Sequence, residues 1–329
     1  MTRNLHTKLS CLISLLILLI SGTVSNAAET DYPNKPLSIV VAYAPGGQGD
    51  TFARLVSDKL SLIYKQPVLV DNKPGVSGTV GTRFVAKAKN DGYTLLLGQT
   101  GEISVNRLLI KDMGYDPMKE LIPVVLIGNA PLVMLAPIDA PYNTVSEFIQ
   151  QARAKQGEFS YGSVGAGTPG HLSAVALTLG AKIDMLHVPY KGVGPLMADL
   201  MAGRLHVFFS SASAALPQIK GGKLKALAVT GKTRHPQLPQ VPTVAEAGLN
   251  GFELESWVAL YVASGTPKEV VQKLSNDVKR AMEQADTKQR ADAAGVEVRY
   301  LTPDATTKLL ERDTASWAKA IKAANIKFD

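Results

Sequence analysis

Two glycine-rich stretches are the residues of this chain best suited to bind a ligand. One reads YAPGGQGDTFARL at positions 43–55, and the other reads YGSVGAGTPGHLSAVAL at positions 161–177. In each, a strand-like run leads through a turn into an apolar helical run. A helix N-terminus leaves four backbone N–H groups unpaired and carries about half a positive charge. Glycines let a ligand approach those groups, so both stretches predict sites for anionic oxygen atoms.

The carboxylate of Asp50 would repel an anion bound at the first stretch. As the N-cap of a helix whose first residue is Thr51, it would instead accept hydrogen bonds from the N–H groups of that helix. Gly47, Gln48 and the hydroxyl of Thr51 are then the groups that face the ligand. The alternative is that the glycines only form a tight turn. The occurrence of a second such stretch favours ligand binding.

Four further side chains have two interpretations each. His171 could donate to an anion or could cap its helix, and Lys191 could supply positive charge or be a solvated loop lysine. Tyr43 and Tyr190 could wall the pocket or pack as half-buried aromatic residues.

Strand-like and helical runs alternate along the chain, and these elements determine where the two glycine-rich stretches lie. In the first half the pairs are 37–43 with 51–64, 67–71 with 77–87, and 93–97 with a polar turn. A second series follows Pro131, and two amphipathic helices are expected after Thr266-Pro267 and Thr302-Pro303. The alternation predicts mostly parallel sheets covered by helices. Ligands of such sheets bind at the carboxyl ends of strands, where both stretches would lie.

The first 27 residues have the pattern of a secretory signal peptide. Arg3 and Lys8 precede an apolar segment at positions 9–20, and small residues lead to Ala27. That segment is shorter than the roughly 20 residues that span a bilayer. We therefore expect export to the periplasm with cleavage after about Ala27. The single cysteine, Cys11, would be lost, which excludes disulfides and cysteine–metal sites from the mature protein.

Composition narrows the class of partner. The 329 residues predict two domains, and 46% apolar with 19% charged residues is an ordinary globular composition. Loss of Arg3 and Lys8 lowers the formal net charge from +7 to +5, which still favours anionic small ligands. No block of Lys and Arg is interleaved with aromatic residues, so nucleic acid is not expected as a partner.

Two classes of enzyme fit the motifs poorly. Gly47 and Gly49 match the dinucleotide fingerprint G-x-G-x-x-G, but Phe52 occupies the place of the third glycine. The hydrolase motif G-x-S-x-G fails at Ser163, which has Tyr161 two residues before it. The histidines have no metal-ligand spacing. We therefore expect a ligand-binding protein with no catalytic residue, no cofactor and no metal. The alternative is an NAD-dependent oxidoreductase that uses the first stretch.

Five longer motifs span essentially the whole mature chain. They read YPNKPLSIVVAYAPGGQGD, PVLVDNKPGVSGTVGTRFVAKAKNDGYTLLLG, HVPYKGVGPLMADLMAGRLHV, GGKLKALAVTGKTRHPQLPQVPTVAEAG and SWVALYVASGTPKEVV. These motifs resemble the Bug family, the extracytoplasmic substrate-binding proteins of tripartite tricarboxylate transporters. The resemblance implies an α/β, two-lobe periplasmic-binding-protein fold (type II-like). Lobe 1 would comprise residues 31–129 and 260–329 and lobe 2 residues 130–259, with a two-crossover hinge near 130–135 and 253–259.

The resemblance also implies the ligand and the partner. The protein would be a monomer that captures a small organic acid, an aliphatic or aromatic dicarboxylate, and delivers it to a membrane permease. A ligand of another anionic or amino-acid-like class is the alternative. The expected site residues are Tyr43, Gly46, Gly47, Gln48, Asp50, Thr51, Gln99, Thr100, Ser163, Val164, Ala166, Gly167, Thr168, His171, Tyr190, Lys191, Ser210 and Ser211.

Two positions depart from the family pattern. Ser210-Ser211 stands where many members have Asp after a strand, and His206 replaces a common acidic residue. An aspartate there would suit ligands with an amino or hydroxyl group. Its loss favours plain dicarboxylates over amino acids.

Overall fold

A computed structural model describes residues 32–252 and 254–323 of the chain. The expected signal peptide, with Cys11, and Glu253 of the expected second hinge crossing lie outside the described residues. A short unit, residues 1–34, precedes a larger unit that begins at Lys35 and holds every strand and helix named here. Among the described residues, no helix is both long and apolar enough to cross a membrane.

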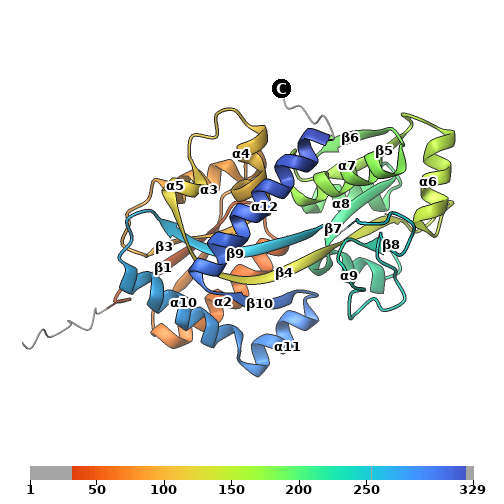
Figure 1. Cartoon of the computed structure of the whole chain (residues 1–329). Coiled ribbons are helices and arrows are strands. Elements are labelled where there is room, and N and C mark those ends of the chain that lie inside the picture. Colours follow the sequence, from red (N-terminus) through yellow and green to blue (C-terminus); the bar gives the residue numbers. More distant parts are fainter. Residues whose placement is uncertain (1–31, 253, 324–329) are drawn as a thin grey trace, which may run out of the picture. The chain divides into compact units, whose positions relative to one another are not determined.

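The first half of the larger unit alternates strands and helices as the sequence predicts (Figure 1). The elements are β1 (Leu37–Val41), α2 (Gln48–Tyr64), β2 (Val68–Asn72), η1 (Val76–Gly78), α3 (Thr79–Ala86), β3 (Thr94–Gln99), η2 (Gly101–Val105), α4 (Asn106–Leu109), α5 (Pro117–Glu120) and β4 (Leu121–Pro137). The expected polar turn after β3 is a single π-helical turn, η2, followed by α4.

The second half repeats the alternation and ends in helices. Its elements are α6 (Val145–Ala154), β5 (Phe159–Ser163), α7 (Pro169–Ala181), β6 (Met185–Pro189), α8 (Val193–Met201), β7 (Val207–Ser211), α9 (Ala212–Lys220), β8 (Leu224–Val229), β9 (Glu255–Ala263), α10 (Lys268–Met282), α11 (Ala285–Ala293), β10 (Glu297–Leu301) and α12 (Pro303–Ala323). The Thr144 hydroxyl accepts from the Glu147 N–H at 3.1 Å, so this side chain caps the start of α6.

The strands form two mixed sheets that share β4. In the first sheet β1 pairs in parallel with β2 and β3, and β9 joins β3 and β4 antiparallel. In the second, β5 pairs in parallel with β6 and β7, while β4 pairs antiparallel with β7 and β8. The prediction of mostly parallel sheets was wrong for β4, β8, β9 and β10. Those strands are not joined to their neighbours through the βαβ units that enforce parallel pairing.

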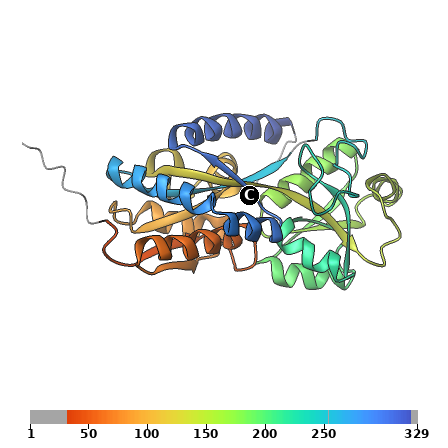
Figure 2. The ribbon, with the colours of Figure 1, turned by 90° about the horizontal axis from the view of Figure 1, so that it is seen from below.

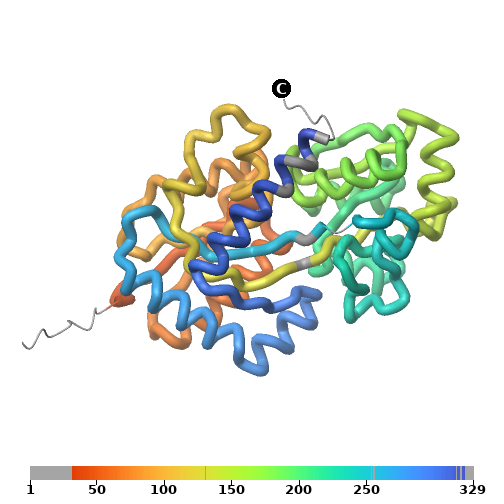
Figure 3. The backbone as a smooth tube through the Cα atoms, viewed as in Figure 1, coloured from red at the N-terminus to blue at the C-terminus, as the bar shows by residue number. Residues whose placement is uncertain are grey.

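β4 connects the two halves of the molecule. Its residues Leu121–Pro131 pair with β9 in the first sheet, and the segment from Leu132 pairs with β7 in the second. Figure 3 traces this strand and β9 between the halves. All of β9 pairs within the first sheet, including residues 255–259, which the sequence assigned to lobe 2.

Buried apolar side chains cover both faces of the second sheet. Along β4, Leu132, Met134 and Ala136 join one core, while Val133 and Leu135 join the core on the opposite face. Because both faces are buried, the strand is apolar without alternation. α12 packs against β4, and Figure 2 places α12 and α2 on opposite sides of the strands.

Candidate functional site

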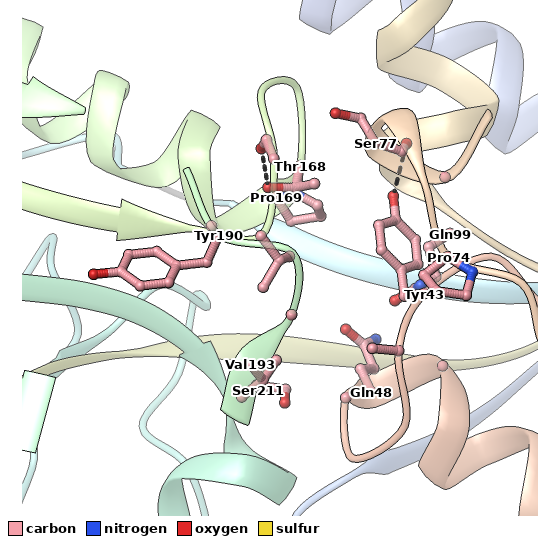
Figure 4. A pocket seen from close by; sticks show the side chains of 18 of the residues that line it. Tyr43, Gln48, Pro74, Ser77, Gln99, Thr168, Pro169, Tyr190, Val193 and Ser211 are labelled. Atoms are coloured by element: carbon pink, nitrogen blue, oxygen red, sulfur yellow. Dashed lines mark hydrogen bonds between the residues drawn. The ribbon is translucent and has the colours of Figure 1, made fainter. Parts of the chain in front are cut away.

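A pocket of about 460 Å³ lies at the carboxyl ends of strands from both sheets. Its wall takes residues from the segments that follow β1, β2, β5 and β6, from the ends of β3 and β7, and from Leu132 of β4 and Ser256 of β9. Figure 4 shows Tyr43, Gln48 and Ser77 on one side and Thr168, Val193 and Ser211 on the other. The fold therefore brings the two glycine stretches to one shared pocket.

The first loop, residues 42–47, delivers the start of α2 to the pocket. Gly47 is the N-cap, in an extended conformation with φ −87° and ψ 178°, and no side chain caps the helix. Gly47, Gln48 and Gly49 all line the pocket, so the first turn of α2, whose N–H groups have no partner within the helix, lies at the wall. Gly46 has φ +89°, a conformation that favours glycine, and it lies outside the wall.

Asp50 has a different position from the one predicted. α2 begins at Gln48, so Asp50 is the third helical residue and not the N-cap. Its carboxylate reaches back to accept from the Gly46 N–H at 3.1 Å, and it also accepts from Arg54 at 3.0 Å and Asn72 at 3.2 Å. Burial alone would raise the pKa of Asp50, but these partners lower it. The acid is thereby ionised and neutralised within its own half.

Two predicted hydroxyl groups are engaged away from the pocket. The Thr51 hydroxyl donates to the Gly47 carbonyl at 3.2 Å, and Thr51 is not part of the wall. Thr100 is fully buried, and its hydroxyl accepts from the Trp257 N–H at 3.1 Å. The Thr51 hydroxyl thus bonds within the first turn of α2, whereas the Thr100 hydroxyl joins the end of β3 to β9.

The second loop, residues 164–168, presents the start of α7. Thr168 is the N-cap and Pro169 the first helical residue. The Thr168 hydroxyl donates to the Gly165 carbonyl at 2.7 Å, which ties the loop together and leaves the N–H of Gly170 uncapped by any side chain. Val164, Thr168 and Gly170 line the pocket, opposite the first loop.

His171 binds the backbone of the second loop and does not line the pocket. Its Nδ1 accepts from the Gly167 N–H at 3.3 Å, and only 5% of the side chain is exposed. Burial, with a contribution from His187, lowers the pKa of His171 to about 3, so the imidazole is neutral. The His171 side chain therefore holds the loop before α7, where it neither caps the helix nor lines the pocket.

Three more predicted residues, in or directly before the second loop, do not line the pocket. Ser163 is fully buried; its Oγ lies 2.7 Å from His187 Nε2 and 3.1 Å from the Gly165 carbonyl. Ala166 and Gly167 belong to the loop but do not line the pocket. No acidic side chain partners this Ser–His pair among the hydrogen bonds of the described residues, so the arrangement lacks the third member of a hydrolytic triad.

The segments after β6 and β7 complete the second half of the wall. Tyr190, Lys191, Gly192 and Val193 lead into α8, whose N-cap Gly192 has no side-chain cap. The Tyr190 hydroxyl donates to Asp199 at 2.7 Å, away from the pocket, as Figure 4 shows. Ser211, the N-cap of α9, lines the pocket.

Ten of the predicted site residues thus line the pocket and eight do not. Those in the wall are Tyr43, Gly47, Gln48, Asp50, Gln99, Val164, Thr168, Tyr190, Lys191 and Ser211. Those outside it are Gly46, Thr51, Thr100, Ser163, Ala166, Gly167, His171 and Ser210. Ser210 is 1% exposed, and its Oγ has no hydrogen-bond partner.

Sequence reasoning missed a third loop, residues 73–78. The segment was expected to begin a helix at Ser77, but Val76 (φ +43°) and Ser77 (φ +53°) adopt left-handed backbone before α3 starts. Pro74, Val76 and Ser77 line the pocket. The motif KPGVSGT, with a glycine on each side of the two left-handed residues, was the available signal.

Glu102 is a buried acid behind this side of the pocket. It accepts from the Tyr43 hydroxyl at 2.8 Å and from the Gln99 N–H at 2.7 Å, and it is fully buried. Burial raises the pKa of Glu102 to about 7 in spite of these hydrogen bonds. The Tyr43 oxygen also lies 3.2 Å from the Ser77 carbonyl, so Tyr43 joins Glu102 to the third loop.

The two halves touch beside the pocket. A Cβ placed on Gly192 would lie 3.1 Å from the Ala44 Cβ, and one placed on Gly165 would lie 2.8 Å from the Ser77 Oγ. Small residues therefore allow loops of both halves to meet around the cavity. Within residues 32–252 and 254–323, no cluster of three or more His, Cys, Asp or Glu could hold a metal ion.

The sequence profile described as "Tripartite tricarboxylate transporter family receptor" matches residues 52–326. The chain belongs to this family. A relative in Pseudomonas sp. (strain P51), the UPF0065 protein of the tcbD-tcbE intergenic region, is 36% identical over 88% of this chain and 86% of its own length. Protein BugT of Bordetella pertussis is 31% identical over 98% of this chain and 99% of its own.

Three solved structures are similar to this one over most of the chain. The R. palustris protein Rpa4515, determined with adipate, superposes with a TM-score of 0.88 at 34% identity, covering 90% of this chain and 99% of that one. MatC of Rhodopseudomonas palustris, determined with malate, gives 0.83 at 31% identity, covering 88% and 100%. The periplasmic binding protein BugD gives 0.86 at 32% identity, covering 90% and 99%. The two-lobe periplasmic-binding-protein fold and the expected family are thus confirmed, and the family is one of substrate-binding receptors.

Proposed function

We propose that this receptor captures a small organic acid in the periplasm and delivers it to the membrane permease of a tripartite tricarboxylate transporter. One carboxylate would be held by the N–H groups that open α2 and α7. The observation that carries the proposal is that both uncapped helix starts line one pocket. The adipate and malate bound by the two R. palustris relatives support an organic acid as ligand.

Backbone groups are strong enough for this task. A hydrogen bond to a charged group contributes about 1.5–3 kcal/mol. A micromolar affinity requires about 8 kcal/mol, so roughly four to six such bonds suffice after ordering costs. The starts of α2, α7 and α8 have no side-chain caps that would occupy their N–H groups. No arginine in the wall is needed.

The two halves would act as lobes that close on the ligand. Ala44 meets Gly192 and Ser77 meets Gly165 beside the pocket, so the described state resembles a closed one. A ligand that contacts both halves gains contacts only when they meet, and that difference shifts the equilibrium toward closure. The hinge would lie where β4 passes between the sheets and in the segment before β9. The permease would then recognise the closed receptor.

A methyl group at the first loop tests the proposed site. A Cβ on Gly47 would have no protein atom within 4 Å, and the extended backbone of Gly47 accepts any residue. We expect Gly47→Ala to weaken binding of an organic acid about tenfold and Gly47→Val to abolish it, because the side chain fills the space that the carboxylate needs. Isothermal titration calorimetry with a panel of dicarboxylates measures this.

The matched control is Gly180→Ala. Gly180 lies near the end of α7, outside the pocket wall, and a Cβ there would meet only the Leu249 side chain at 3.2 Å, so its substitution should leave affinity unchanged. Normal binding by Gly47→Val would refute the site. Mass spectrometry of acid released from the denatured receptor would identify the natural ligand.

A further inference from the structure

We infer that the receptor takes up a proton at Glu102 when it binds an organic acid, and that Tyr43 transmits the protonation state of Glu102 to the third loop. The inference rests on the proposed function, since it assumes that the pocket binds an organic anion. It adds a coupling between pH and affinity, and it assigns Glu102 as a positioning residue behind the pocket wall.

Glu102 lies one side chain behind the wall and has no cation as a partner. Its two carboxylate oxygens contact the Tyr43 hydroxyl and the Gln99 N–H, and both of those residues line the pocket. The titratable groups that face Glu102 from neighbouring elements are phenols: Tyr43 after β1, Tyr115 before α5 and Tyr261 on β9. In the part of the chain that the structure describes, no lysine, arginine or histidine pairs with this acid. A buried negative charge there has no formal counter-charge.

The Tyr43 hydroxyl has two acceptors but only one proton. Its oxygen lies 2.8 Å from Glu102 Oε2 and 3.2 Å from the Ser77 carbonyl oxygen (Figure 4). With Glu102 ionised, the hydroxyl can donate to only one of these two oxygens. With Glu102 protonated, the acid donates to Tyr43 and Tyr43 donates to Ser77, so both contacts are hydrogen bonds. The neutral acid therefore satisfies this geometry in full.

The hydrogen bond to Ser77 matters because the third loop contains left-handed backbone. Ser77 has φ +53°, a conformation that a residue with a side chain keeps only where its surroundings hold it. Its carbonyl is held by Tyr43 and by Asn106 Nδ2, which donates at 2.8 Å. Ionisation of Glu102 draws the Tyr43 proton away from this carbonyl and so loosens the third loop.

The third loop meets the opposite half of the molecule. A Cβ placed on Gly165 would lie 2.8 Å from the Ser77 Oγ, and one placed on Gly167 would lie 2.7 Å from the Asn106 Oδ1. Ser77 and Asn106 thus border the second loop, and a firmly held third loop favours the state in which the two halves meet. The neutral form of Glu102 and the closed state therefore stabilise each other.

A bound anion acts in the same direction. Because Tyr43 and Gln99 both line the pocket and contact Glu102, a carboxylate in the pocket opposes a second negative charge on this acid. Binding therefore raises further the pKa of Glu102, which burial already raises to about 7. The receptor takes up a proton as it binds, and its affinity falls as pH rises through neutrality.

Proton uptake can be measured directly. Titration calorimetry of the wild-type receptor at pH 7.0, in phosphate and in Tris buffer, would use the tightest-binding straight-chain dicarboxylate from succinate to suberate. These acids are ionised at this pH, and burial lowers the pKa of the four described histidines. If binding raises the pKa from about 7 to about 8, roughly 0.4 proton is taken up per ligand, and affinity falls about sixfold from pH 6.5 to pH 8.5.

Glu102→Gln tests the assigned residue, because an amide resembles the neutral acid. Its oxygen can accept from the Gln99 N–H, and its NH₂ group can donate to the Tyr43 oxygen. We expect this variant to bind without proton uptake and, at pH 8.5, several-fold more tightly than the wild type. Glu283→Gln, at an exposed acid outside the wall, is the control and should keep the proton uptake of the wild type.

Tyr43→Phe tests the transmitting hydroxyl and keeps an aromatic ring in the wall. It should weaken binding more at pH 6.5 than at pH 8.5, because the Tyr43 proton is free to reach Ser77 only when Glu102 is neutral. Equal losses at both pH values would show that Tyr43 does not transmit the protonation state.

Two results would overturn the inference and leave the receptor function standing. They are binding without proton uptake in the wild type, and proton uptake that persists in Glu102→Gln. Failure of every acid to bind would instead refute the proposed function itself.

Discussion

The first and second loops share a geometry but differ in the chemistry that supports it. In each, the third residue of the following helix reaches back to the N–H group two residues before the helix starts. Asp50 accepts from Gly46 in the first loop, and His171 accepts from Gly167 in the second. The reach-back fixes the loop while leaving the first-turn N–H groups for a ligand.

The difference between the two lies in charge. Asp50 is ionised and is neutralised by Arg54, whereas His171 is buried and neutral beside His187. A carboxylate in a helix's first turn interacts well with the helix dipole but competes with a bound anion. If the first loop binds an anion as proposed, the ion pair of Asp50 with Arg54 in the same half offsets the repulsion between the Asp50 carboxylate and that anion.

The largest expected effect concerns the buried group behind the first loop. Glu102 has a pKa raised to about 7 by burial, so between pH 4.5 and about 7 the folded state holds a proton that the unfolded state releases. Stability should therefore fall as pH rises through this window, by about 3 kcal/mol in total relative to Glu102→Gln. Urea unfolding of both proteins from pH 5 to pH 8 measures it, and parallel profiles would contradict the assignment.

The second loop should respond to pH with the opposite sign. Because the pKa of His171 is lowered to about 3, the unfolded state gains a proton below about pH 6.5 that the folded state does not. This proton uptake by the unfolded state lowers the free energy of unfolding as pH falls. The contribution of Glu102 is therefore measured as the difference between the wild type and Glu102→Gln, because the wild-type profile contains both effects.

A matched pair of substitutions would sharpen the contrast of charge. The two variants are Asp50→Asn and His171→Asn. Asp50→Asn removes the ionic partner of Arg54, whereas His171→Asn exchanges one neutral side chain for another. We expect losses in unfolding free energy of about 2 and about 1 kcal/mol, respectively, since hydrogen bonds to charged groups contribute more than neutral ones. Urea midpoints at pH 7.5 compare them. Equal losses would mean that the charge of Asp50 is not the distinguishing feature.

The smallest expected effect is at the second loop's N-cap. Thr168→Ala removes the hydroxyl that donates to the Gly165 carbonyl, so the loop is ordered less well before ligand binds. We expect a several-fold weaker affinity for the organic acid, against complete loss in Gly47→Val. An effect as large as that of Gly47→Val would indicate that the Thr168 hydroxyl itself contacts the ligand.

Local sequence signals predicted the two glycine stretches and the strands other than β4 and β10. They placed the start of α2 three residues too late, and that shift turned Asp50 from a reach-back residue into an expected N-cap. Gln48 lies in the pocket wall as expected because its position depends only on the glycine turn.

Other features depend on tertiary contacts that no local pattern specifies. Glu102 contacts the site only because β3 and the π-helical turn bring it beneath Tyr43. The third loop, residues 73–78, was not predicted, because its alternating small and apolar residues also fit the start of a helix. The antiparallel pairing of β4 with β9 joins segments more than a hundred residues apart, beyond the reach of periodicity.

β4 has a mechanical consequence for the receptor. Its hydrogen bonds hold it to β9 up to Pro131 and to β7 from Leu132, so any swing of the halves must be absorbed by a few backbone torsions near that junction. The pairing with β9 is already irregular between Pro123 and Val125 and between Leu126 and Gly128. If the halves close as proposed, β4 would bend at this junction, and its resistance to bending would affect how fast a bound acid is released.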